Sequence, residues 1–178
     1  MHPSITNVYG KKLRVRVCGL CWGTPQSPEV DTSESPEGDA PESPEGDEGT
    51  LLMVNHRGLQ DTDFWAPPGG GLEFGESVSE RLQKEFLEET GLSVMTARFL
   101  FGCEFIRDPL HAIELFFEVA VVGGALQKGN DPELPMIHEV AFMSPADIKR
   151  ISSGSLHGIF SLVPTPGDLK TLSGFFRI

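Results

Sequence analysis

Three glutamates stand close together near the end of a segment with helical character. Glu85, Glu88 and Glu89 have i, i+3 and i+4 spacing, which places their side chains on one turn of an α-helix. Three acids at a helix end repel one another and oppose the helix dipole. Carboxylate oxygens suit a hard ion such as Mg²⁺ or Mn²⁺. The spacing indicates a divalent-metal site, and the helix alone leaves a solvated acidic patch as the alternative.

A helical wheel places two of these acids on the apolar side of the helix. At about 100° per residue, Glu85 and Glu89 continue the stripe that Val78, Leu82 and Phe86 begin. Asp and Glu are almost never buried without a partner. The change from apolar to acidic residues along one face therefore favours a cation that neutralises these carboxylates.

The residues around this segment predict where the helix begins and ends. Ser77 and Glu80 have capping-box spacing, and Gly91 is a typical helix-ending glycine, so we expect a helix over 78–89. The turn-rich stretch 66–71 precedes it.

Five β-strands and a second helix are expected elsewhere in the chain. The helix is predicted to begin after Ser144, with a proline at its first position. Residues beyond Ser152 give mixed signals and are left unassigned. The strands are expected where apolar residues alternate or cluster between turns, at 12–22, 51–56, 96–106, 112–122 and 139–143.

The charge of the chain is concentrated in one segment. The formal net charge is −12, and nine acidic residues lie between Gly23 and Thr50 without any Lys or Arg. Pro, Gly, Ser and like charges cannot form a core, so we expect 24–49 to be a disordered insertion in a hairpin loop of one domain, 1–178. An acidic arm that binds a partner is the alternative.

Composition also narrows the function classes. The chain has no apolar run long enough for a membrane span and no basic, apolar N-terminal signal, so a soluble cytoplasmic protein is expected. The acidity disfavours binding to a nucleic acid polymer. Cys18 and Cys21 form a C-x-x-C, but in a strand they point to opposite faces, which favours reduced thiols over a redox or zinc site.

The spacing of the acids and glycines resembles the Nudix box, G-x5-E-x7-R-E-U-x-E-E-x-G-U, where U is an apolar residue. One fixed position differs, because Lys84 stands where the box has arginine. The remaining positions match at Gly70, Glu76, Glu85, Phe86, Glu88, Glu89, Gly91 and Leu92.

The resemblance implies an α/β/α sandwich with a mixed β-sheet and a loop-helix-loop motif. It implies Mg²⁺ or Mn²⁺ on Glu85, Glu88 and Glu89, with Glu85 or Glu88 as general base, and Lys84 bracing the motif through Glu76. The implied activity is hydrolysis of a nucleoside diphosphate derivative such as ADP-ribose, a nucleotide sugar or an oxidised nucleoside triphosphate. A Nudix-like module that senses a nucleotide without cleaving it is the alternative.

Several other residues are candidates for roles near the motif. Arg57 could meet a phosphate and Trp65 could stack on a base, although a surface arginine and a core tryptophan explain them as well. Gly70 and Gly71 would let the loop backbone approach both the helix and a phosphate closely, although a plain tight turn explains them nearly as well. The expected partner is a small nucleotide, and a homodimer is left open. Four further acids could add a base or a metal ligand, or be ordinary surface acids: Glu114, Glu118, Glu133 and Glu139.

Overall fold

The computed structural model describes residues 10–23, 49–57, 63–129 and 137–178. The insertion expected at 24–49 lies outside these ranges except for Gly49, and Glu133 lies outside them too. Disorder of the insertion and a single domain over 1–178 both stay predictions. None of the helices in the described ranges is long and apolar enough to cross a membrane.

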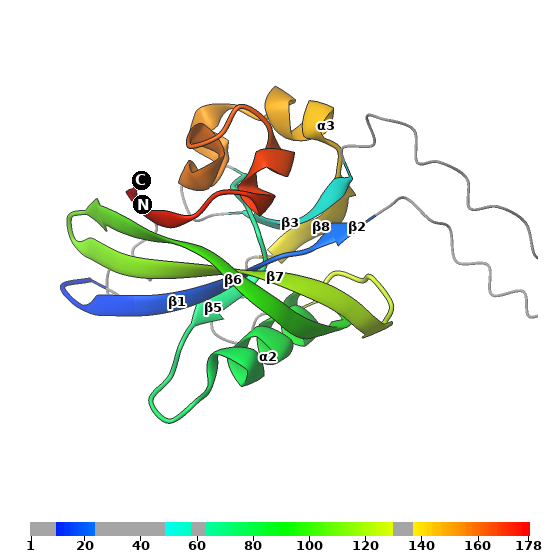
Figure 1. Ribbon diagram of the computed structural model, residues 1–178, viewed down its shortest axis with the longest axis horizontal. Helices are drawn as coiled ribbons and strands as arrows, with labels where there is room; N and C mark the ends of the chain where they lie inside the picture. Colours follow the sequence, from blue (N-terminus) through cyan, green and yellow to red (C-terminus); the bar gives the residue numbers. More distant parts are fainter. Residues whose placement is uncertain (1–9, 24–48, 58–62, 130–136) are drawn as a thin grey trace, which may run out of the picture.

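The larger of two β-sheets has five strands in the order β5-β1-β7-β6-β9 (Figure 1). The β1–β7 and β6–β9 pairs are parallel, whereas β1–β5 and β6–β7 are antiparallel, so the sheet is mixed. The strands are β1 (Leu13–Leu20), β5 (Gly69–Gly71), β6 (Leu92–Arg107), β7 (Leu110–Gly124) and β9 (Gly174–Arg177).

A smaller sheet is built around β3, which pairs antiparallel with three other strands. Trp22 is the partner of Leu51, so the segments on either side of the insertion do pair. The single strand predicted over 12–22 is wrong, because Leu13–Leu20 lies in the larger sheet and only Trp22–Gly23 lies in this one. The strands of this sheet are β2 (Trp22–Gly23), β3 (Thr50–His56), β4 (Trp65–Ala66) and β8 (Ile137–Met143).

Both predicted helices form, and each begins at its predicted cap. Ser77 and Glu80 make a reciprocal capping box at the start of α2 (Val78–Thr90), and Gly91 follows it with a left-handed φ of 71°. Ser144 caps α3 (Pro145–Arg150). The segment that the sequence left unassigned contains three short 3₁₀ helices, at Ser153–Ser155, Gly158–Ser161 and Pro166–Lys170.

The helices lie on opposite sides of the strands. Figure 1 shows α2 below the sheets and α3 with the C-terminal segment above them. Each side has its own core: Leu82 and Phe86 of α2 pack with Leu52, while Ile159 packs with Leu51 and Met53. Leu51, Leu52 and Met53 alternate between the two cores because successive side chains of a β-strand point to opposite faces of the sheet. The α/β/α sandwich expected from the sequence is confirmed.

The two cores also separate the cysteines of the C-x-x-C. Cys18 lies in the core on the C-terminal side and Cys21 in the core beside α2, so the prediction that they point to opposite faces is confirmed. Both are free thiols, and burial raises the pKa of Cys21 to about 11. A protonated, buried thiol is a packing residue rather than a nucleophile.

Candidate active site

Two of the three clustered glutamates are buried on the inner face of α2. Glu85 is 4% exposed and Glu89 is 1% exposed, whereas Glu88 is half-buried. They follow Leu82 and Phe86 on the same face, and this confirms the helical wheel drawn from the sequence. The fold therefore brings two carboxylates, one turn apart, into its interior.

Arg81 is a buried cation on the same helix. It is 2% exposed and forms an ion pair with Glu85, four residues later. Its Nη1 atom also lies 3.8 Å from Glu76 Oε2 in the loop before the helix. Arg81 thus links the loop to Glu85 and compensates part of the cost of burying that carboxylate.

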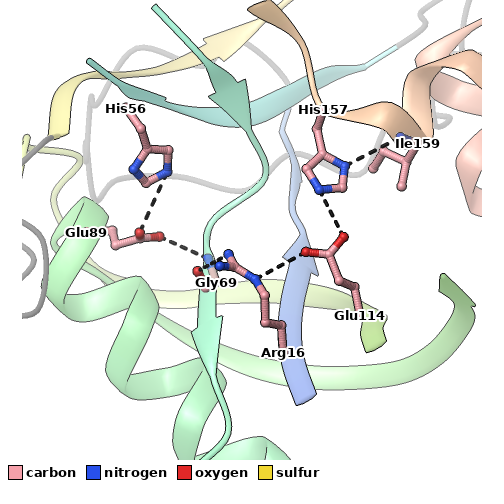
Figure 2. A network of polar contacts seen from close by, with 7 residues as sticks. All are labelled: Arg16, His56, Gly69, Glu89, Glu114, His157 and Ile159. Carbon is pink, nitrogen blue, oxygen red and sulfur yellow. Dashed lines mark hydrogen bonds and ion pairs between the residues drawn. The ribbon is translucent and has the colours of Figure 1, made fainter. Parts of the chain in front are cut away.

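Glu89 is held from the other side by β5 and β3. The backbone N–H of Gly69 donates to Glu89 Oε2 at 2.9 Å, and His56 Nε2 lies 4.0 Å from Oε1 (Figure 2). Burial, followed by the charges of Arg16 and His157, lowers the pKa of His56 to about 4. His56 is therefore neutral at pH 7, and its contact with Glu89 is not an ion pair there.

Gly70 is required where the loop meets the helix. A Cβ at this position would overlap the carboxylate of Glu85, so the close approach of β5 to α2 depends on the missing side chain. Gly71 is buried and pairs with Arg16 of β1. The two glycines thus bring the loop backbone against both the helix acids and the central sheet.

A second polar cluster lies on the other side of β5 and β1, as Figure 2 shows. Arg16 Nε is 3.2 Å from Glu114 Oε1, and His157 Nε2 is 3.1 Å from Glu114 Oε2. Burial by itself would raise the pKa of Glu114, but His157 and Arg16 outweigh it and lower this pKa to about 2. Glu114 is therefore an ionised carboxylate in the interior.

The donor atoms on α2 fit the chemistry of a hard divalent cation, because Glu85, Glu88 and Glu89 offer carboxylate oxygens only. Within the parts of the chain that the structure describes, no three His, Cys, Asp or Glu side chains are already gathered in a metal-binding arrangement. The metal site thus stays a prediction from the spacing of the acids.

A family model described as NUDIX domain matches residues 44–159, well over half of the chain. The chain belongs to the Nudix hydrolase family. The Nudix box then corresponds to β5, the following loop and α2, and its three final glutamates are those that α2 carries.

Similar proteins agree with this assignment. An ADP-ribose pyrophosphatase of Methanocaldococcus jannaschii is 34% identical over 87 residues, which are 47% of this chain and 51% of the relative. The chain thus spans about half the length of this curated relative.

Two solved Nudix-type structures share the fold. A MutT protein from Methanosarcina mazei Go1 has a TM-score of 0.59 at 17% identity, covering 90% of this chain and 91% of its own. An ADP-ribose pyrophosphatase from Streptococcus suis has a TM-score of 0.56 at 17% identity, covering 92% and 98%.

The bracing residue of the Nudix box differs from the sequence prediction. Lys84 was expected to pair with Glu76, but Lys84 is exposed and the buried cation beside Glu76 is Arg81. Residues three apart lie on neighbouring parts of a helix surface, so an arginine one turn earlier can reach the same loop. The cation that lies beside Glu76 is thus an arginine at a position that the box pattern does not name.

Two predicted substrate-binding residues have other contacts in the structure. Arg57 is exposed, and its Nε donates to Asp63 Oδ1 at 2.8 Å. Trp65 packs against the core on the C-terminal side, and its carbonyl accepts from the N–H of His157 at 2.9 Å. A substrate contact by either residue stays a prediction.

The extra acids divide into a buried one and exposed or partly exposed ones. Glu114 is 6% exposed, so its interpretation as a surface acid is wrong. Glu139 is exposed, and Glu118 pairs with the exposed Arg98 at 2.7 Å. Glu114 shares a strand face with Ala112 and Phe116, which are both buried, and alternation in the sequence did not reveal that this face is covered.

Proposed function

We propose that this chain is a divalent-metal-dependent hydrolase that cleaves the diphosphate linkage of a nucleoside diphosphate derivative. Water attacks phosphorus, the bridging P–O bond breaks, and a nucleoside monophosphate leaves together with the second phosphate product. Candidate substrates are ADP-ribose, nucleotide sugars and oxidised nucleoside triphosphates. Because the M. jannaschii relative is named an ADP-ribose pyrophosphatase, ADP-ribose is the first substrate to test.

The observation that carries this proposal is the pair of buried carboxylates on α2. Glu85 and Glu89 lie one turn apart in the interior, and half-buried Glu88 lies between them in sequence. Burying a carboxylate costs a large desolvation free energy unless a counter-charge or hydrogen-bond donors compensate it. A helix that retains them in its inner face is best explained by the chemistry they perform.

Glu85, Glu88 and Glu89 would hold Mg²⁺ or Mn²⁺. When bound, the cation would neutralise the diphosphate oxygens and lower the pKa of the attacking water. Gly69 orients Glu89 through its N–H, and Arg81 orients Glu85 through the ion pair. Glu85 and Glu88 are the two candidates for the general base that takes the proton of the water.

The function is tested by product formation with a panel of substrates. Wild-type protein, Glu89→Gln and a control, Glu73→Gln, are incubated with each substrate and Mg²⁺, and nucleoside monophosphate is separated by chromatography. Glu73 is exposed in the loop before α2. We expect Glu89→Gln to lower kcat by about a hundredfold or more, with the control close to wild type.

The same panel separates an enzyme from a nucleotide-sensing module. If wild-type protein cleaves no substrate with Mg²⁺ or Mn²⁺ while calorimetry shows that ADP-ribose or another nucleotide binds, the hydrolase proposal is wrong and the sensing module takes its place. Binding of Mn²⁺ alone, followed by electron paramagnetic resonance, tests the metal site without any substrate. Loss of Mn²⁺ binding in Glu89→Gln is the expected result.

A further inference from the structure

Arg16 lies on β1 of the larger sheet, between β7 and the edge strand β5. In the register of the sheet it is opposite Glu114 on one side and Gly71 on the other. Its side chain is 30% exposed, whereas that of Glu114 is only 7% exposed. A guanidinium at such a position needs hydrogen-bond acceptors, because burial removes water from it.

Arg16 contacts groups on two different strands, a carboxylate through an ion pair and a carbonyl through a hydrogen bond. Its Nε atom faces Glu114 Oε1 at 3.2 Å, and its Nη2 atom donates to the carbonyl oxygen of Gly69 at 3.3 Å. The rigid, planar guanidinium has donors that point in fixed directions, so one arginine can hold both groups at once. A lysine ammonium has no such fork.

Gly69 connects this arginine to the Nudix helix. While its carbonyl accepts from Arg16, its N–H donates to Glu89 Oε2 at 2.9 Å. The two peptide groups that flank one glycine are thus held by Arg16 and Glu89 respectively. Since glycine has wide conformational freedom, these two bonds together restrict the direction in which the N–H points at Glu89.

The other end of the cluster is anchored in the C-terminal segment. His157 Nε2 faces Glu114 Oε2 at 3.1 Å, and His157 Nδ1 accepts from the N–H of Ile159 at 3.4 Å. With Nδ1 turned towards the backbone of Ile159, Nε2 is the ring nitrogen that faces Glu114. His157 and Arg16 therefore face different oxygens of the same carboxylate, Oε2 and Oε1 respectively.

We propose that Arg16, held by Glu114, is a positioning residue for the reaction: it fixes the Gly69 backbone that orients the carboxylate of Glu89. The inference rests on the proposed hydrolase function for its catalytic consequence. Its structural consequence, the placement of the Gly69 N–H that donates to Glu89, does not depend on that function. Residues that orient a metal-binding carboxylate typically change activity or metal affinity by about 10–100-fold when they are replaced.

The chain offers a matched control for an arginine substitution. Arg98 also contacts a glutamate of β7, with its Nε donating to Glu118 at 2.7 Å, and its Nη2 donates to the carbonyl of Lys170 at 3.0 Å. This cluster has a similar set of contacts, a glutamate and a backbone carbonyl, but is more exposed. Its carbonyl belongs to a residue far from α2 in the sequence. Arg98→Met removes one such arginine without touching the Nudix box.

The experiment compares Arg16→Met, Arg16→Lys and Arg98→Met with wild-type protein. Hydrogen exchange of the Gly69 amide is measured by NMR in metal-free protein, and kcat and KM are measured with ADP-ribose and Mg²⁺. For Arg16→Met we expect faster Gly69 exchange by about tenfold or more and a kcat lower by about 10–100-fold, with KM within about threefold. Arg16→Lys should recover part of both losses, and Arg98→Met should change neither.

Unchanged Gly69 exchange in a folded Arg16→Met protein would overturn the proposal, and so would a fall in kcat of the same size in Arg98→Met. If Arg16→Met does not fold, Glu114→Gln replaces it, since glutamine keeps the shape and one acceptor oxygen. Faster Gly69 exchange in Glu114→Gln is then required. Amide exchange needs no substrate, so the two proposals fail separately. If wild-type protein cleaves no substrate but Gly69 exchanges faster in Arg16→Met, the hydrolase function is refuted and the role of Arg16 in placing Gly69 stands.

Discussion

Two arginines of the larger sheet make nearly the same bonds in different surroundings. Arg16 and Arg98 each contact a glutamate of β7 and a backbone carbonyl. The Arg16 partner, Glu114, has 7% of its side chain exposed, whereas Glu118, the partner of Arg98, has 30% exposed. Geometry alone would rank the shorter Arg98 pair as the stronger.

Burial reverses that ranking. An ion pair in contact with water gains little, because solvent screens both charges. When one partner of a buried pair is removed, the other is left without compensation in a medium that solvates it poorly. The comparison teaches that the importance of an arginine–glutamate pair here depends on what surrounds it and on which backbone group it holds.

The largest expected difference between the clusters is in stability. Glu114→Ala should lower the free energy of unfolding by about 3 kcal/mol, because it leaves Arg16 and His157 without their shared acceptor. Glu118→Ala should lower it by less than about 1 kcal/mol. Urea denaturation of both variants at pH 7 measures the difference, and equal losses would show that burial does not distinguish the two pairs.

The pH dependence of the free energy of unfolding at acid pH should also reveal the buried Glu114. The folded protein lowers the pKa of Glu114 from 4.5 to about 2, so the stabilisation is complete above about pH 4.5 and is lost as the pH falls towards 2. In this window wild-type stability should rise with pH by up to about 1.4 kcal/mol per unit more steeply than that of Glu114→Gln. Parallel profiles of the two proteins below pH 4.5 would contradict the buried, ionised state of Glu114.

His56 gives a second, separate pH window beside α2. Its pKa falls from 6.5 to about 4 on folding, so stability is lost as the pH falls through that range. Between pH 6.5 and 4, the free energy of unfolding of His56→Gln should therefore change less with pH than that of wild type. Below pH 4 the two proteins should show the same pH dependence. Acid unfolding followed by circular dichroism at fixed urea measures both windows.

The helix side of the site could be predicted from the sequence because its signals are local. Ser77 and Gly91 fix the ends of α2, and the helical period then places Glu85 and Glu89 on the buried face. All of this information lies within fifteen residues. The fold class could be inferred as well, through the resemblance that the same spacing carries.

The strand side could not be predicted, because its causes are distant in the sequence. Glu114 is buried since β1 lies parallel beside β7 and brings Arg16 opposite it. His157 reaches it from a segment of 3₁₀ helices that has no periodic signal. Alternation within β7 predicts which residues share a face, but it cannot show that both faces are covered.

The box arginine is a third case, in which the pattern named the wrong position. Arg81→Lys should cost about 1–2 kcal/mol, because lysine cannot contact Glu76 and Glu85 with separate nitrogens as the guanidinium does. The free energy of unfolding is measured by urea denaturation. A loss below about 0.5 kcal/mol would mean that Arg81 does not brace the motif.

The smallest expected effect belongs to Lys84, at the position where the family pattern has arginine. Its side chain is exposed on α2, and alanine is the best helix former, so Lys84→Ala should change the free energy of unfolding by no more than about 0.5 kcal/mol. If Lys84 instead braced the loop through Glu76, its loss should resemble that of Arg81→Lys. Urea denaturation of Lys84→Ala, Arg81→Lys and the double variant decides between the two positions, because a coupling energy near zero is expected only where a single residue, Arg81, performs the bracing.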